Sequence, residues 1–201
     1  MLILAADTSL PLLSVALLRE GSVIAAAVLE GKLSRNEKLL PAIDWLLTES
    51  GVDRREVDLF AVTRGPGSFT GVRIGLATMQ GLALALGKPL CAMSTHEAIA
   101  PESRRVVIVD DAGRGESYLS QYDDGRELVA PRLASKEEVG AMEGERIVVA
   151  AFMQRENVAV SCARRAAAIE QRGDGDRYRD ITPVYVRLAE AEVKLQQKSG
   201  A

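Results

Sequence analysis

Residues 63–75 read Thr63-Arg64-Gly65-Pro66-Gly67-Ser68-Phe69-Thr70-Gly71-Val72-Arg73-Ile74-Gly75. The stretch joins a predicted strand, 59–63, to a predicted helix, 72–86. A glycine-rich turn at such a junction can direct backbone N–H groups and a helix N-terminus towards an anion, so Gly65, Gly67 and Ser68 are candidates to face a nucleotide. The stretch lacks the Lys-Ser/Thr ending of a Walker loop. The alternative is a tight structural turn whose glycines allow close packing.

Two sets of predicted strands surround this stretch and share one design. Apolar runs at 2–6, 12–18 and 23–29 form the first set, and shorter runs at 106–109, 117–122 and 128–130 form the second. With an offset of 104 positions, Asp7 falls on Asp111 and Gly21 falls on Gly125. We interpret the pattern as two lobes that each begin with a β-meander, and chance similarity is the alternative.

Asp7 and Asp111 end the first strand of each set, where a carboxylate could hold Mg²⁺ beside a nucleotide. Carboxylates that simply form turns at strand ends are the alternative. Other catalytic schemes lack their residues: His96 is the only histidine, and no Gly-x-Ser-x-Gly elbow occurs. We therefore predict no catalytic residue and no metal site in this chain.

Two predicted helices of the first lobe carry more apolar surface than one core needs. In the helix 36–50, introduced by the capping pattern Ser34-Arg35-Asn36-Glu37, one side carries the stripe Leu39, Leu40, Ile43, Leu46 and Leu47. Trp45 falls on the opposite side, near Lys38 and Ala42. The helix 72–86 is apolar almost all round and therefore needs cover on more than one side. We predict a partner interface made of Trp45, Ala42, Lys38, Gly71, Gly75, Thr78, Leu82 and Ala85.

Composition narrows the classes of function. The chain has 201 residues, 47% of them apolar, with a net charge of −3. Because no long Lys/Arg cluster suggests a basic patch, we expect any contact with RNA to be indirect. The two cysteines lack metal-ligand spacing and are expected to be reduced thiols. We expect a cytoplasmic protein, because neither a signal peptide nor an apolar run of about 18 residues is present.

The motif at residues 65–75, together with Asp7-Thr8-Ser9 and Leu39-Leu40-Pro41, resembles the bacterial TsaB (YeaZ) family. The resemblance runs from residue 1 to about residue 122, and 183–187 are similar to the closing motif of the family. That family is the dimerisation subunit of the machinery that makes N6-threonylcarbamoyladenosine at position 37 of tRNA. Arg35-Asn36 replace a frequent His-Ser/Thr pair, so no role of that histidine is carried over.

The resemblance implies an α/β fold of the actin/acetate-kinase (ribonuclease-H-like) type, duplicated in two lobes. We expect a partner-binding lobe at 1–101 and a shortened second lobe with a C-terminal helix at 102–201. In the catalytic relative, TsaD, a His-x-x-x-His motif binds metal, and its positions fall here on Thr95 and Ile99, which are poor ligands. The implied role is a non-catalytic partner of a TsaD-like subunit without a cofactor of its own. A TsaE-like ATPase, ATP bound by the complex, and self-association of the chain alone are further expectations.

Two other functions remain open at this point. An independent ATP-dependent phosphotransferase would need phosphate loops in both lobes, and the second loop, 111–115, is weak. A metallopeptidase-like hydrolase would need the histidine pair that is absent.

Overall fold

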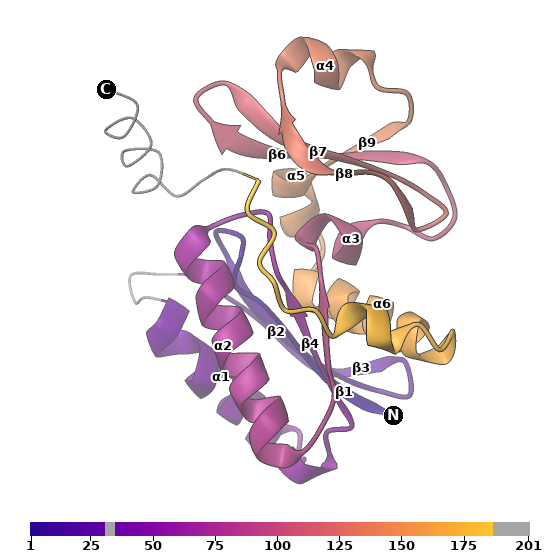
Figure 1. Ribbon diagram of the computed structural model, residues 1–201. Helices are drawn as coiled ribbons and strands as arrows, with labels where there is room; N and C mark the ends of the chain where they lie inside the picture. Colours follow the sequence, from indigo (N-terminus) through magenta and orange to yellow (C-terminus); the bar gives the residue numbers. More distant parts are fainter. Residues whose placement is uncertain (31–34, 187–201) are drawn as a thin grey trace, which may run out of the picture.

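The computed structural model describes residues 1–30 and 35–186, which form two stacked lobes (Figure 1). The first lobe is built on a five-stranded sheet of order β3-β2-β1-β4-β5. Its strands are β1 (Leu2–Asp7), β2 (Leu13–Arg19), β3 (Ser22–Leu29), β4 (Leu59–Thr63) and β5 (Leu90–Met93). Strands β1 to β3 form the predicted antiparallel meander, and β4 and β5 run parallel to β1.

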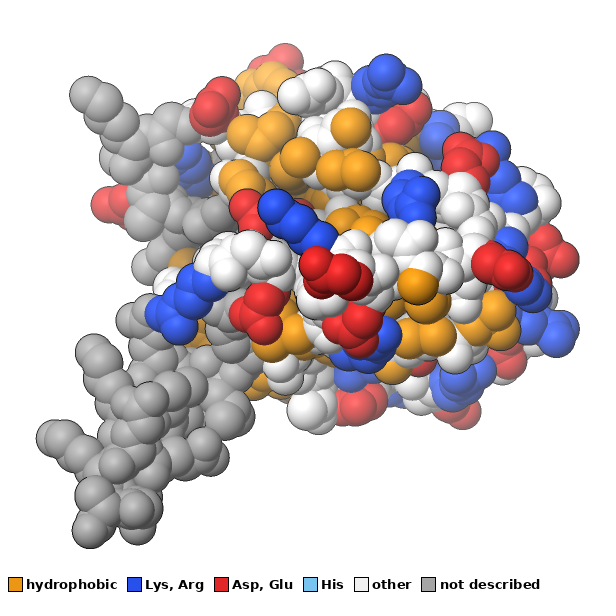
Figure 2. All heavy atoms as spheres, turned by 90° about the horizontal axis from the view of Figure 1, so that it is seen from above, with side chains coloured by type: hydrophobic (Ala, Val, Ile, Leu, Met, Phe, Trp, Pro, Cys, Tyr) orange, Lys and Arg blue, Asp and Glu red, His pale blue; other side chains and the backbone are white. Residues whose placement is uncertain are grey.

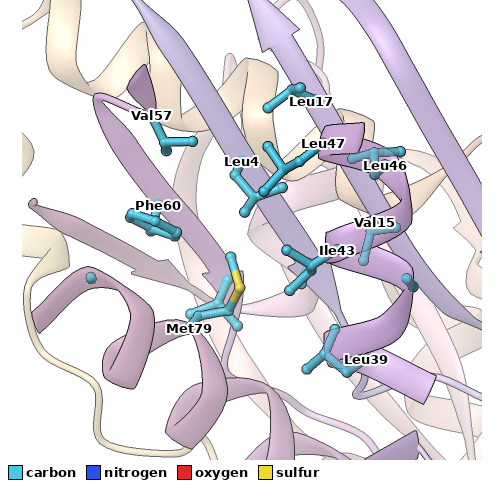
Figure 3. Packing of buried hydrophobic residues seen from close by; sticks show 14 of the residues in the cluster. Leu4, Val15, Leu17, Leu39, Ile43, Leu46, Leu47, Val57, Phe60 and Met79 are labelled. Carbon is cyan, nitrogen blue, oxygen red and sulfur yellow. The ribbon is translucent and has the colours of Figure 1, made fainter. Parts of the chain in front are cut away.

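One face of this sheet is covered by two helices, α1 (Arg35–Glu49) and α2 (Phe69–Leu86). Figure 3 shows the core between them, where Ile43 of α1 and Met79 of α2 point towards Phe60 and Leu4 of the sheet. Helix α2 begins at its cap Ser68 and ends at Gly87, whose φ of 63° is the left-handed conformation typical of a helix C-terminus. The glycine-rich stretch therefore joins β4 to α2, as predicted.

The second lobe repeats the meander in a four-stranded sheet of order β8-β7-β6-β9. The strands are β6 (Val106–Gly113), β7 (Glu116–Asp123), β8 (Arg126–Ala134) and β9 (Glu145–Val148). Each first strand, β1 or β6, lies between an antiparallel β-hairpin partner and a parallel strand. This shared order confirms the duplicated, ribonuclease-H-like α/β fold. The short helices around this sheet are α3 (Thr95–Ile99), α4 (Lys136–Ala141) and α5 (Val149–Met153).

Helix α6 (Val158–Gln171) does not stay with the second lobe. It covers the other face of the first sheet, where its Ala163 and Ala166 pack in one cluster with Ala5 and Ala61 of the strands. With helices on both faces, every residue of β1 is buried, which explains its continuous apolar sequence. The simple division at residue 101 therefore separates the sheets but not the helices.

One local prediction, the place of Leu40 in the core stripe of α1, differs from the structure. Leu40 is exposed, because it lines the wall of the groove between α1 and α2 instead of packing in the core. The C-terminal helix expected at the end of the second lobe and the capping residue Ser34 lie outside the described residues.

Candidate functional site

The glycine-rich loop packs against the end of β1. The N–H of Ser68 donates to the carbonyl oxygen of Ser9 at 2.7 Å. A Cβ atom on Gly67, whose φ is +149°, would lie 2.3 Å from that same oxygen. The Ser68 hydroxyl accepts from the N–H of Gly71 and so caps α2. These groups, predicted as candidates to face an anion, are engaged by their own chain, and the contacts support the alternative of a tight structural turn.

The segment 180–186 closes the loop from the opposite side. The N–H of Val184 donates to the carbonyl oxygen of Arg64 at 2.7 Å, and a Cβ on the buried Gly65 would lie 3.0 Å from the Val184 carbonyl oxygen. The ring of Tyr185 stacks on Phe69 with centroids 4.6 Å apart, and Arg73 donates from Nε to the Tyr185 hydroxyl. The closing motif thus holds the loop and the first turn of α2 in place.

Asp7 lies under this loop and is completely buried. Its Oδ1 accepts hydrogen bonds from the hydroxyls of Ser9 and Thr63, while Oδ2 has no partner among the described residues. Burial raises the pKa of Asp7, and the hydrogen bonds from Ser9 and Thr63 oppose this effect. The carboxyl group of Asp7 is therefore closed off from solvent in this structure.

The structural counterpart of Asp7 is Asp110 rather than Asp111. In both lobes the acid follows the last residue that pairs with the parallel neighbour, Ala6 in β1 and Val109 in β6. The predicted offset was therefore one residue too long. Asp111 is exposed, and its carboxylate accepts from the N–H of Gly113 in the turn. Burial, helped by the charges of Asp111 and Asp7, raises the pKa of Asp110 to about 6.

Thr95 and Ile99, at the positions that correspond to the metal-binding histidines, make contacts within the core. Thr95 is buried and its hydroxyl lies 2.8 Å from that of Ser9. Ile99 packs in the apolar cluster between the lobes. His96 is buried, its Nδ1 contacts the Ser120 hydroxyl at 2.7 Å, and burial lowers its pKa to about 3. Across residues 1–30 and 35–186, no group of three His, Cys, Asp or Glu side chains is placed to hold a metal.

Helices α1 and α2 both leave large apolar side chains exposed, and we call their outward sides, with the groove between them, the α1–α2 surface. Trp45 is 54% exposed and Leu84 is 73% exposed. Between the helices lies a groove of about 460 Å³ whose walls include Leu40 and Pro41 of α1 and Leu82 and Leu86 of α2. Sequence reasoning found Trp45 but missed Leu84, although its position opposite the buried Met79 and Ala83 in the helical pattern could have revealed it.

Some predicted interface residues lie elsewhere. Ala42, on the inner side of α1, packs in the core. Gly71 and Gly75 are buried, and a Cβ on either would collide with Thr8, at 2.0 Å from its carbonyl oxygen and 2.3 Å from its hydroxyl. These small residues admit the chain's own β1 end, not a partner. Ala85 is exposed, and Lys38, Thr78 and Leu82 are half-buried, so these four remain available to the surface.

By length and composition alone, α2 could cross a membrane, with a third of it buried inside the structure. The inner side of α2 packs on the sheet, and its outer side belongs to the α1–α2 surface. On the face of the second lobe shown in Figure 2, basic and acidic side chains alternate without a continuous basic stripe.

A family model and two named relatives match this chain. The family model described as "TsaD: tRNA N6-adenosine threonylcarbamoyltransferase" matches residues 32–154. A protein of Bacillus subtilis named tRNA threonylcarbamoyladenosine biosynthesis protein TsaB is 38% identical over 131 residues, 62% of this chain. The protein of the same name in Escherichia coli is 39% identical over 128 residues, 61% of this chain. These alignments span only 57% and 55% of the two relatives.

Solved structures agree over a longer part of the chain. The structure titled YeaZ from Pseudomonas aeruginosa covers 92% of this chain and 99% of its own, with 30% identity and a TM-score of 0.73. Among the sequence relatives, a TsaB protein of Haemophilus influenzae aligns over 154 residues at 34% identity. Sequence and structure together show that the chain belongs to the TsaB (YeaZ) family.

Proposed function

We propose that this chain is a non-catalytic subunit in the formation of N6-threonylcarbamoyladenosine on tRNA, and that its α1–α2 surface binds a TsaD-type catalytic subunit. The names of the relatives support the pathway. The observation that carries the proposal is the apolar groove between α1 and α2, together with the large exposed side chains of Trp45 and Leu84 on these helices. Apolar grooves and exposed apolar patches on soluble proteins often mark sites of protein–protein interaction.

The partner class follows from the family match. Residues 32–154, which match the TsaD family model, include both α1 and α2. A TsaD-type protein is therefore expected to carry a related pair of helices. Two such pairs can pack around an approximate two-fold axis, as in isologous interfaces. A second copy of this chain is the competing occupant when the catalytic subunit is absent.

The non-catalytic role is supported by the site geometry. Thr95 and Ile99 make core contacts, and the loop over Asp7 is packed against Ser9 and Val184. We infer that the chain needs no metal or nucleotide of its own. ATP, and a TsaE-like ATPase, would then act on the assembled complex.

The test is co-purification of the full chain with the TsaD-type protein of its own organism, followed by tRNA modification assays with and without it. We expect a stable complex and modification that depends on this chain, with no ATP turnover by the chain alone. Full modification in its absence contradicts the proposal. So does ATP hydrolysis by the purified chain that Asp7→Asn abolishes.

A further inference from the structure

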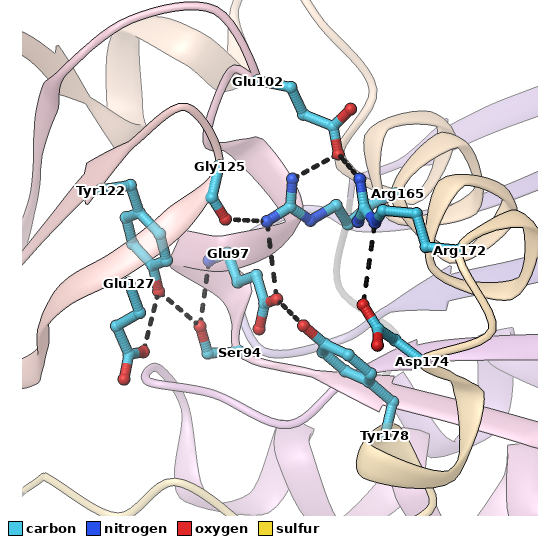
Figure 4. Close-up of polar contacts among 10 residues, drawn as sticks. All are labelled: Ser94, Glu97, Glu102, Tyr122, Gly125, Glu127, Arg165, Arg172, Asp174 and Tyr178. Atoms are coloured by element: carbon cyan, nitrogen blue, oxygen red, sulfur yellow. Dashed lines mark hydrogen bonds and ion pairs between the residues drawn. The ribbon is translucent and has the colours of Figure 1, made fainter.

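Arg165, on α6, reaches from the first lobe into the second. Its side chain is only 5% exposed. Nη1 donates to Glu102 Oε1 at 2.6 Å, and Nη2 donates to the carbonyl oxygen of Gly125 in the turn between β7 and β8. Nη2 also lies 3.6 Å from Glu97 Oε1 on α3. Figure 4 shows this single guanidinium group at the centre of three segments: α3, the linker between the sheets, and the hairpin of the second lobe.

Gly125 is shaped for this contact. Its φ of +72° is a left-handed turn conformation, and a Cβ added there would lie 2.5 Å from Arg165 Nη1. A side chain at this position would therefore displace the guanidinium group. The hairpin turn and the arginine fit only because residue 125 is a glycine.

The ends of this network are anchored on both sides. Glu97 accepts a hydrogen bond from the Tyr178 hydroxyl at 2.5 Å, and Glu102 is shared with Arg172 at 3.0 Å. Tyr178 and Arg172 belong to the first-lobe side, like α6. A buried guanidinium group loses its hydration. Here two carboxylates and one carbonyl oxygen face Nη1 and Nη2, while Nε has no hydrogen-bond partner among the described residues.

Two other polar contacts between the lobes are neutral. The Ser94 hydroxyl lies 3.1 Å from that of Tyr122, and His96 contacts Ser120. An apolar cluster that includes Leu10, Ile99 and Ile108 lies beside them. Apolar contacts resist separation but set direction weakly, whereas a planar guanidinium group fixes both the distance and the orientation of its acceptors.

We propose that Arg165 is a latch that holds the second sheet at a fixed position on the first lobe. The latch forms one wall of a polar cavity of about 650 Å³ between the lobes, which Arg64 and Tyr178 line from the first-lobe side and Arg126 from the second. Without the latch, the hairpin β7–β8 moves away from α6, the cavity opens, and the lobes behave as two bodies. This inference does not depend on the proposed function.

The test is hydrogen–deuterium exchange on the full chain carrying Arg165→Met. We expect exchange at least about tenfold faster in peptides covering β7 and β8, with no change in peptides covering β1 and β4. Arg164→Met, which removes the exposed neighbour on the same helix, is the matched control and should exchange like the natural chain. Equal acceleration in both lobes would show that Arg165 supports the whole fold, and no acceleration would show that it fixes nothing; either result overturns the latch.

A second variant separates the latch from a stranded charge. In Arg165→Met, Glu97 keeps its charge and loses its cation. The double variant Arg165→Met with Glu97→Gln removes that charge and should still show the selective acceleration in β7 and β8. If the double variant exchanges like the natural chain, the single variant acted through Glu97 and the proposal fails.

Discussion

The hydroxyl of Thr8 donates to the carbonyl oxygen of Gly71 at 2.6 Å, so the end of β1 is tied to the first turn of α2. This contact requires residue 71 to lack a side chain, because a Cβ there would lie 2.0 Å from the Thr8 carbonyl oxygen. Strand β1, which opens the fold, is thus joined at one glycine to helix α2, which contributes to the α1–α2 surface.

Gly71→Ala is expected to lower the free energy of unfolding by about 2–3 kcal/mol, because the rigid backbone of Thr8 must move to admit the methyl group. Gly81→Ala is the matched control on the same helix. Nothing lies within 4 Å of its added Cβ, and it should raise stability by about 0.5–1 kcal/mol through helix propensity. Denaturant titration of both variants measures the difference, and similar midpoints would contradict the close approach.

Asp110→Asn is expected to stabilise the protein at pH 7.5 but not at pH 3.5. The folded pKa of about 6 exceeds the ordinary 3.8, so the stability that this carboxyl contributes is present below pH 3.8 and is lost as pH rises through 6. The full difference would correspond to about 3 kcal/mol, and partial exposure reduces the expected gain to about 1 kcal/mol. Thermal melts at both pH values measure it, and an equal gain at both would reject the charge as the cause.

His96 should make the fold sensitive to mild acid. Burial lowers its pKa to about 3 from the ordinary 6.5, so its stability contribution is present above pH 6.5 and is lost as pH falls towards 3. At pH 5 the loss is about 2 kcal/mol. We expect His96→Asn to flatten the stability profile between pH 7.5 and 5. The comparison is best made in the Asp110→Asn background, because Asp110 changes stability with pH in the opposite direction. An unchanged slope of stability against pH would contradict the predicted role of His96.

Trp45→Ala is expected to weaken binding to the TsaD-type subunit by about 2 kcal/mol or more, as at an interface hot spot, with little change in the melting temperature. Leu128→Ala is the control, because Leu128 is 51% exposed but lies on β8 of the other lobe. Calorimetric titration of both variants against the partner decides the matter. Equal affinities for Trp45→Ala and the natural chain would place the interface elsewhere.

Patterns that depend on neighbours in the sequence predicted the fold well. The two meanders, the helix after the glycine-rich loop and the exposed Trp45 follow from apolar periodicity and turn residues. Contacts between distant segments were out of reach. The stripe of α1 alone could not show that Leu40 borders a groove, since the wall of that groove comes from α2. Gly71 and Gly75 suggested a close approach, but the sequence could not say that the approaching backbone was Thr8.

Arg165 shows the same limit for the polar network. In the sequence it is the second residue of an Arg-Arg pair on an ordinary helix, and its partners lie 40 to 68 positions away, at Gly125, Glu102 and Glu97. The helical pattern does place it on the buried side with Cys162 and Ile169. A charged residue on an apolar stripe was the signal available.

Because α6 returns to pack on the first sheet, that sheet can be covered on both faces only late in the synthesis of the chain. Residues 2–93 supply all five strands of the first sheet, but the cover for one face arrives only with residues 158–171. Until then the side of β1 and β4 that carries Ala5 and Ala61 has no layer over it. The ribosome must synthesise the whole second sheet before α6 can cover the first. A nascent chain or a truncation that ends before α6 therefore exposes an uncovered, alanine-rich sheet face to chaperones and proteases.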